Sequence, residues 1–217
     1  MLRADLHIHS SYSADSSATL EDIVACCLRK GINCIALTDH NTISGALKMK
    51  QIAPFTVIVG EEILTLSGEV IGFFLTEEIP ARLPAKEAVA RIKSQGGLVG
   101  VPHPFDRFRP SAIHRRALEA LLPDIDFIEV FNSHTLLHSD LAKAQRLAQT
   151  NGLLASAGSD AHIPSEIGNA YVEMPEFSNQ DEFRLALAQG KIFGRRANPW
   201  RYMVATLAKL AKRLKKH

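Results

Sequence analysis

Long apolar runs are missing from this sequence. No stretch of about 18 residues is both uncharged and apolar, so the sequence predicts no membrane-spanning helix. Polar and charged residues arrive by Arg3 and Asp5, which is unlike a secretory signal peptide. The cysteines (Cys26, Cys27 and Cys34) are odd in number, and none has the spacing of a disulfide framework or a zinc ribbon. We therefore expect a cytoplasmic protein whose cysteines are buried thiols.

Uniform basicity is also missing. The formal net charge is +2, but six Lys and Arg residues lie between 201 and 217, and the rest of the chain holds 19 basic and 23 acidic residues. A slightly acidic body lacks the electrostatic footprint of a general nucleic-acid-binding protein. We expect no stable nucleic-acid complex.

The C-terminal stretch is a separate feature. Residues 199–217 are expected to form a basic amphipathic helix with Met203, Leu207, Leu210 and Leu214 on one stripe. Such a helix either packs on the main domain or makes weak contact with an anionic membrane surface. The sequence thus predicts a main domain over residues 1–198 and this C-terminal helix.

Short apolar segments alternate with amphipathic segments along the main domain. The expected strands are 4–9, 33–40, 55–63, 98–104, 126–132, 153–162 and 170–174, with a hairpin over 64–75. The expected helices are 19–31, 42–53, 85–97, 111–122, 140–152 and 179–190. Short, almost wholly apolar strands alternating with helices are typical of a buried parallel sheet. About seven such units favour a closed α/β barrel, and no dinucleotide-binding glycine fingerprint follows the first strand.

Histidines and acids stand at or just beyond the end of nearly every long predicted strand. They are His7 and His9; Asp39 and His40; Glu61 and Glu62; His103; Asn132, His134 and His138; and Asp160 and His162. In a parallel barrel the carboxyl ends of the strands share one rim, where active sites are built. Imidazole with carboxylate, and without thiolate, favours zinc, manganese or iron.

The predicted ligand set is too large for one ion. It comprises His7, His9, Asp15, His40, one of Glu61 and Glu62, His103, Asp160, His162, and one of His134 and His138, with Asn132 as a further candidate. Such a set fits two or three ions that share bridging carboxylates. His7 and His9 alternate along a strand and therefore point to the same side. Asp5 shares that side in a regular strand, and we expect Asp5 and Asp39 to orient ligand histidines by hydrogen bonding.

Six ordered motifs resemble those of the PHP family, named for polymerase and histidinol phosphatase. They are DLHIHS, TDHNT, GEEI, PHPFD, EVFNSH and GSDAH, and the resemblance spans residues 2 to about 197. It implies a distorted seven-stranded (β/α) barrel, a two- or three-metal centre and phosphoester hydrolysis. It also implies ligands at His7, His9, Asp15, His40, Glu62, His103, Asp160 and His162. For one further position we take His138, with His134 as the alternative.

The expected function is that of a metal-dependent phosphoesterase acting on a small phosphorylated metabolite, a nucleotide or an oligonucleotide end. His162 is expected to stabilise the leaving oxygen. Arg107 and Arg196, with their neighbours Arg109 and Arg195, are the candidates for clamping the phosphate. Two alternatives stay open: an amidohydrolase-type metal hydrolase, and a metal-stabilised regulatory module without catalytic activity.

Overall fold

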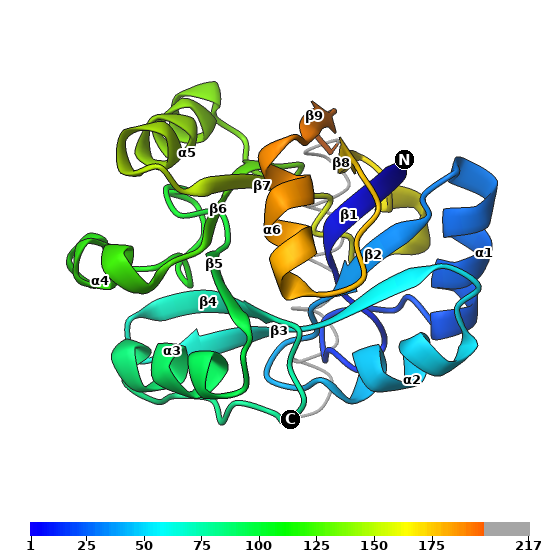
Figure 1. The fold of residues 1–217 in the computed structure, drawn as a ribbon, viewed down its shortest axis with the longest axis horizontal. Coiled ribbons are helices and arrows are strands. Elements are labelled where there is room, and N and C mark those ends of the chain that lie inside the picture. Colours follow the sequence, from blue (N-terminus) through cyan, green and yellow to red (C-terminus); the bar gives the residue numbers. More distant parts are fainter. Residues whose placement is uncertain (198–217) are drawn as a thin grey trace, which may run out of the picture.

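Seven strands curve into a nearly closed barrel in the computed structural model, which describes residues 1–197 (Figure 1). The strand order is β7-β6-β5-β4-β3-β2-β1, and β8 and β9 extend the sheet beyond β1. Neighbouring barrel strands run parallel except at β4, which is antiparallel to both β3 and β5. The fold is thus a distorted seven-stranded α/β barrel, as the sequence predicts.

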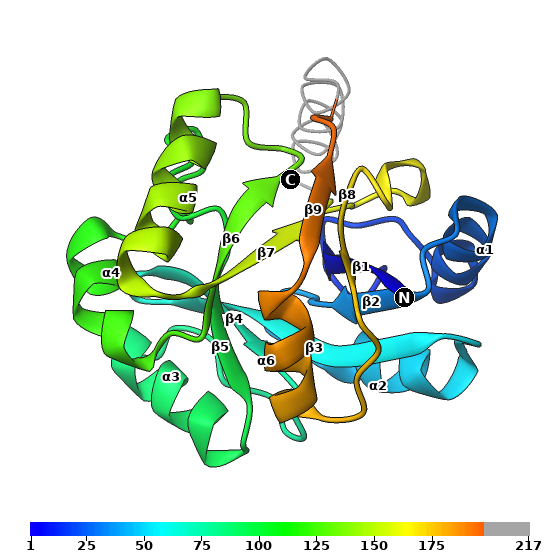
Figure 2. The same ribbon diagram turned by 45° about the horizontal axis from the view of Figure 1, so that its top comes forward.

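The strands are mostly short and buried. Their bounds are β1 Leu2–Ile8, β2 Cys34–Leu37, β3 Thr56–Thr65, β4 Gly68–Phe73, β5 Leu98–Val101, β6 Phe127–Asn132, β7 Leu154–Gly158, β8 Ala170–Met174 and β9 Lys191–Gly194. The helices are α1 Leu20–Lys30, α2 Ser44–Ile52, α3 Ala85–Ser94, α4 Arg115–Leu121, α5 His138–Asn151 and α6 Gln180–Ala188, with 3₁₀ turns η1 Leu122–Asp124 and η2 Pro164–Glu166. Figure 2 shows α1 and α2 on one side of the strands and α3, α4 and α5 on the other.

Local sequence signals set several of these bounds. The Thr19 side chain accepts a hydrogen bond from the Asp22 N–H at the start of α1, and Gly31 ends the helix in the left-handed conformation. The predicted hairpin is confirmed as the antiparallel pair β3/β4, which turns between Thr65 and Gly68. Strand β3 is longer than expected, so Glu62 lies within the strand and not at its end.

The barrel closes where the end of β7 meets β1. The His7 carbonyl accepts a hydrogen bond from the Asp160 N–H, and the His9 N–H donates to the Ala161 carbonyl, at 2.8 and 2.9 Å. The Asp5 carboxylate strengthens this junction by accepting the N–H groups of Ser159 and Gly168, each at 2.8 Å. Closure therefore brings the first and the last predicted ligand motifs together.

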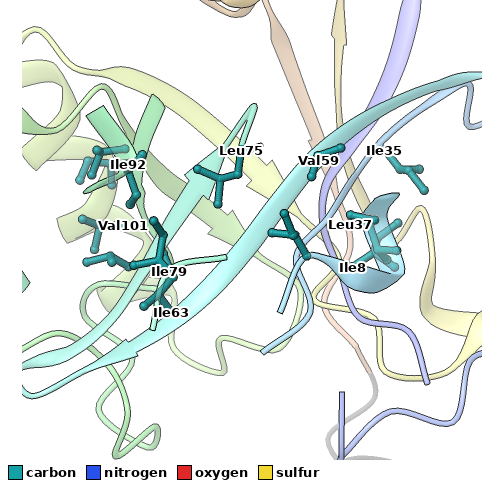
Figure 3. Close-up of a cluster of buried hydrophobic side chains, with 14 of the residues drawn as sticks. Ile8, Ile35, Leu37, Val59, Ile63, Leu75, Ile79, Ile92 and Val101 are labelled. Carbon is teal, nitrogen blue, oxygen red and sulfur yellow. The ribbon is translucent and has the colours of Figure 1, made fainter. Parts of the chain in front are cut away.

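Two hydrophobic clusters occupy the two faces of the sheet. One joins residues from the strands with Phe183 of α6, which packs against Phe73 and closes one end of the barrel. The other lies between the strands and helices α1 to α5, and part of it is drawn in Figure 3, with Ile35 and Leu37 of β2 labelled. Burial of these two layers leaves the opposite rim of the barrel for polar residues.

A bulge in β1 decides which side chains face the barrel interior. Asp5 pairs with Ile35 and Ile8 with Leu37, so β1 holds one more residue than β2 between these two pairs. Leu2, Ala4 and Leu6 belong to the cluster that contains Phe183. Ile8 belongs to the other cluster, between the strands and helices α1 to α5. The bulge therefore breaks the regular alternation of side chains along β1 that the sequence suggests. As a result, Asp5 does not lie on the same side of the strand as His7 and His9.

Two features complete the described part of the chain. Strand β9, which the sequence analysis did not predict, pairs with β8. Among the described residues, no helix is both long and apolar enough to span a membrane. The predicted basic helix over residues 199–217 lies outside the described residues.

Candidate metal centre

Glu62 of β3 lies at the centre of a buried group of histidines. Its Oε2 atom is 3.4 Å from His7 Nε2, 3.3 Å from His9 Nε2 and 3.2 Å from His40 Nδ1. Its Oε1 atom is 3.0 Å from His103 Nε2. One carboxylate therefore faces four imidazoles from three separate segments, which is the arrangement expected of a bridging ligand.

Asp160 forms a second centre beside the first. Its Oδ1 atom is 3.2 Å from His9 Nε2 and 3.6 Å from His7 Nε2. Its Oδ2 atom accepts hydrogen bonds from the Arg109 guanidinium and, at 3.1 Å, from the Asn132 amide. The two oxygens thus have separate roles, because one is held by donors while the other faces the histidines.

Four overlapping groups of side chains in the described residues are close enough to hold an ion. They are His7, Glu62 and His103; His7, His9 and Asp160; His40, Glu62 and Glu69; and His9, His40 and His162. Histidines and Glu62 are shared between groups, as in centres where several ions have common ligands. Asp15 joins the last group, because its Oδ2 atom lies 3.1 Å from His162 Nε2 and 3.4 Å from His40 Nε2.

Three histidines are oriented through their Nδ1 atoms. The Nδ1–H of His7 donates to Glu129 Oε1 at 3.0 Å, and that of His162 donates to the Asp160 carbonyl at 2.9 Å. His9 Nδ1 lies 3.3 Å from the Ser13 hydroxyl, which itself donates to Asp39 at 2.8 Å. Each contact leaves the lone pair of Nε2 directed into the cluster, which is how ligand imidazoles are commonly fixed.

Burial and charge make this cluster a candidate site for cations. Burial disfavours ionised carboxylates, but Arg109 and His7 hold the pKa of Asp160 well below its usual value, and His7 and His40 do the same for Glu62. Glu62 Oε2 and Asp160 Oδ1 are nevertheless buried and make no hydrogen bond among the described residues. Such atoms are costly unless they are paired, and the Nε2 atoms of His7 and His9 are only 3.1 Å apart. Divalent ions between these atoms would pair the carboxylate oxygens and would also accept the lone pairs of the two Nε2 atoms.

The backbone is strained at two of these residues. His103 and Asp160 have φ angles of 28° and 54°, in the region that residues with a Cβ rarely adopt. Strain of this kind persists where the surrounding structure requires it and is found mainly at functional sites. The strained backbone at His103 and Asp160 directs both side chains into the cluster.

Most of the predicted ligand positions lie together. His7, His9, Asp15, His40, Glu62, His103, Asp160 and His162 belong to the connected set described above. Asp39 contacts His9 through the Ser13 hydroxyl. Asp5 does not support a ligand ring; its carboxylate holds Ser159 and Gly168 because the bulge turns it away.

The two candidate histidines that follow β6 lie apart from the cluster, whereas Asn132 contacts it. His138 is exposed at the first residue of α5, whereas His134 is 3.4 Å from Glu166 and its ring is 6.2 Å from that of His162. Asn132 holds Glu129 and Asp160 through its amide.

The predicted phosphate clamp is also divided. Arg107 pairs with Asp140, and Arg196 donates to the Leu136 carbonyl. Arg109, only a neighbour of the preferred Arg107, is the arginine that contacts the cluster.

Two acids in the site escaped the sequence analysis. Glu69 of β4 lies 3.9 Å from His40 Nδ1 and 3.8 Å from His103 Nε2. Glu129 of β6 binds His7 through one oxygen and the His103 N–H through the other. A charged residue within an otherwise apolar strand was the available signal in both cases.

Comparisons with known proteins agree with this geometry. The family model described as PHP domain matches residues 5–79, and the model described as PHP-associated matches residues 138–192. An uncharacterised protein of Methanocaldococcus jannaschii is 38% identical over 180 residues, which cover 82% of this chain and 72% of that protein.

Two solved structures show the same fold. A two-domain protein of Bacteroides vulgatus, described as containing a predicted PHP-like metal-dependent phosphoesterase, has a TM-score of 0.67 at 22% identity. The match covers 89% of this chain and 65% of that one. A lesion-specific endonuclease of Pyrococcus furiosus has a TM-score of 0.64 at 20% identity, over 88% of this chain and 57% of its own. With both PHP models matched and the relative aligned over most of its length, the chain belongs to the PHP family.

Proposed function

We propose that this protein is a metal-dependent phosphoesterase that hydrolyses phosphate monoesters or terminal phosphoesters of a small metabolite, a nucleotide or an oligonucleotide. The observation that carries the proposal is the pair of buried carboxylate oxygens, Glu62 Oε2 and Asp160 Oδ1, facing converging imidazole nitrogens. Membership of the PHP family supports metal-dependent hydrolysis as the class of reaction.

The proposed ions are two or three divalent cations of zinc, manganese or iron. His7, His9 and Asp160 would hold one, Glu62 would bridge to a second with His103, and His40, Glu69, Asp15 and His162 would complete the set. Glu69 and not His138 fills the further position in this proposal. When bound, such ions would activate water as a nucleophile and neutralise charge on the phosphate oxygens.

The chain's own residues orient the substrate and handle charge. Arg109 donates to Asp160, which holds the aspartate in place and sets a guanidinium group beside the cluster, where its positive charge would favour a bound phosphate. His162, whose Nε2 atom lies beside Asp15, would contribute to stabilising the leaving oxygen through the ion that it helps to hold. Burial of the cluster keeps the dielectric constant low, which strengthens both interactions.

The test is metal-dependent hydrolysis of p-nitrophenyl phosphate. His9→Ala and Asp160→Ala should abolish both metal binding and hydrolysis, whereas His114→Ala, at the exposed start of α4, should change neither. Hydrolysis of amides or lactones in preference to the phosphate would favour an amidohydrolase. Undiminished hydrolysis by Asp160→Ala with a normal metal content would overturn the assignment.

A further inference from the structure

Three chain segments form one edge beside the metal centre. Arg107, in the loop after β5, binds Asp140 of α5 at 2.8 Å, and Arg196 binds the Leu136 carbonyl at 2.7 Å. The Ala197 N–H also donates to the Ser133 carbonyl at 2.7 Å. Arg109 connects this edge to the metal centre through Asp160. Residues 107–109, 133–143 and 195–197 are therefore neighbours, and we call them the basic edge.

The basic edge carries more positive charge than its own acids compensate. Its three segments contain five Lys and Arg residues and one acid, Asp140, which is buried. Arg107 and Lys143 share that single carboxylate, and the Arg107 side chain is 52% exposed. Arg196 and Arg195 are exposed and donate to neutral oxygens, of Leu136 and Asn169. The edge therefore presents guanidinium groups to solvent next to the proposed phosphoesterase site.

A phenylalanine stands among these charges. Phe108 is 61% exposed between Arg107 and Arg109, and its backbone N–H is fixed by Asp106 at 3.1 Å. Phe73, Phe127 and Phe183, in contrast, are fully buried. An aromatic face between arginines is the combination that proteins use for single-stranded nucleic acid, because bases stack on the ring while phosphates bind the cations.

We propose that the basic edge binds the part of a single-stranded oligonucleotide that lies beyond the phosphate held at the metal centre. Arg107 and Arg196 contact its backbone phosphates, and Phe108 stacks on a base. The inference rests on the proposed phosphoesterase function and narrows its substrate class from phosphate esters in general to short oligonucleotides. A mononucleotide engages the metal centre and Arg109 but leaves most of the edge unused.

The binding test uses the full chain loaded with Mn²⁺ and a fluorescein-labelled tetranucleotide with phosphorothioate linkages, which slow turnover during the measurement. Fluorescence anisotropy gives the dissociation constant as a function of salt. Each lost phosphate contact should reduce the salt slope for a single strand by about 0.7, so Arg107→Gln combined with Arg196→Gln should reduce it by about 1.4. Phe108→Ala should weaken binding about tenfold.

The matched control is Arg91→Gln. Arg91 of α3 is 49% exposed and pairs with Glu87, so it resembles Arg107 in exposure and in having an acidic partner. It should bind the tetranucleotide as the unmodified chain does. A slope in the double variant equal to that of Arg91→Gln, or equal affinity for mononucleotide and tetranucleotide, would overturn the inference.

The two proposals fail separately. If p-nitrophenyl phosphate is hydrolysed but the edge variants bind normally, the inference about the oligonucleotide is wrong and the phosphoesterase function stands. If no phosphate ester is hydrolysed with any of the metals, the proposed function is wrong, whatever the anisotropy shows.

Discussion

At the scale of single residues, the site depends on how each imidazole is held. Glu129 is buried. One of its oxygens accepts a hydrogen bond from His7 Nδ1, and the other accepts from the His103 N–H and the Asn132 amide. It therefore fixes two ligand histidines without lying among the candidate ion-binding groups. Loss of outer hydrogen bonds of this kind typically lowers metal affinity by about 10- to 100-fold.

Glu129→Gln should lower metal affinity by about 10- to 100-fold, because the amide cannot accept from all of these donors with the charge of a carboxylate. Titration of metal-free protein with Mn²⁺ or Zn²⁺ measures this. Glu173→Gln, which alters a partly exposed partner of Arg3, serves as the control and should leave affinity unchanged. Equal affinities in the two variants would show that Glu129 does not orient His7.

Metal uptake should release protons and become tighter as the pH rises toward 9. Burial disfavours the imidazolium of His9, but Asp160 and Glu62 outweigh this effect and raise the pKa of His9 to about 9 in the absence of metal. A ligand imidazole must be neutral, so at pH 7 the ion displaces that proton. Calorimetry in two buffers of different ionisation enthalpy counts the protons. An affinity that does not change between about pH 6 and pH 9 would contradict this account.

The sequence predicts most of these residues because their types are unusual at strand ends, whereas their partners are less visible. Glu69 was missed because β4 was expected only as half of a hairpin. Nothing in the sequence indicated that this strand reaches the rim of the barrel where the candidate ligands lie. His138 was preferred on motif spacing, but α5 begins at that residue and leaves it exposed. Choosing between Arg107 and Arg109 requires the fold. The two arginines are alike in the sequence and differ only in the residues that they contact.

At the scale of elements, the bulge in β1 and the close approach of β7 place the first two histidines. A Cβ added at Gly158 of β7 would lie 2.2 Å from His7 Cβ and 3.0 Å from Glu129 Oε1. Only glycine allows β7 to approach β1 so closely. Periodicity predicts both strands, but a one-residue bulge leaves no signal in the apolar pattern, which is why Asp5 was assigned to the wrong side.

Gly158→Ala should destabilise the fold by about 1–3 kcal/mol or more, since the new methyl group forces β7 away from β1. It should also weaken metal binding, because His7 and Glu129 both adjoin the clash. Chemical denaturation and metal titration check the two effects. Gly152→Ala is the control: its Cβ meets nothing within 4 Å, so its cost should come from its φ of 64° alone, about 1–2 kcal/mol. Normal metal affinity in Gly158→Ala would contradict the proposed packing.

At the scale of the whole molecule, the metal centre joins strands from across the barrel. Its candidate ligands come from β1, β3 and β4 and from the segments that follow β1, β2, β5 and β7. Ions bound here would therefore connect both sides of the closure and stabilise only the folded chain. The fold class was predictable because alternating strands and helices are encoded locally, whereas this convergence follows from closure.

Saturating metal should raise the melting temperature. At a free concentration of about 100 times the dissociation constant, one bound ion stabilises the native state by about 2.7 kcal/mol, or about 5–10 °C for a chain of this size. Thermal melts with Mn²⁺ and with EDTA measure the shift, and Asp160→Asn should show little of it. A shift of equal size in that variant would place the stabilising ion elsewhere.

The most direct test is a titration of metal-free protein with Mn²⁺ that records bound ions per chain and the rate of phosphate release from p-nitrophenyl phosphate. The account predicts that hydrolysis is absent without metal and appears only as a second ion binds, since in the proposed centre Glu62, which faces both His9 and His103, would be shared by two ions. Phosphate release that is as fast in metal-free protein, or that needs no ion beyond the first, would contradict the polynuclear centre.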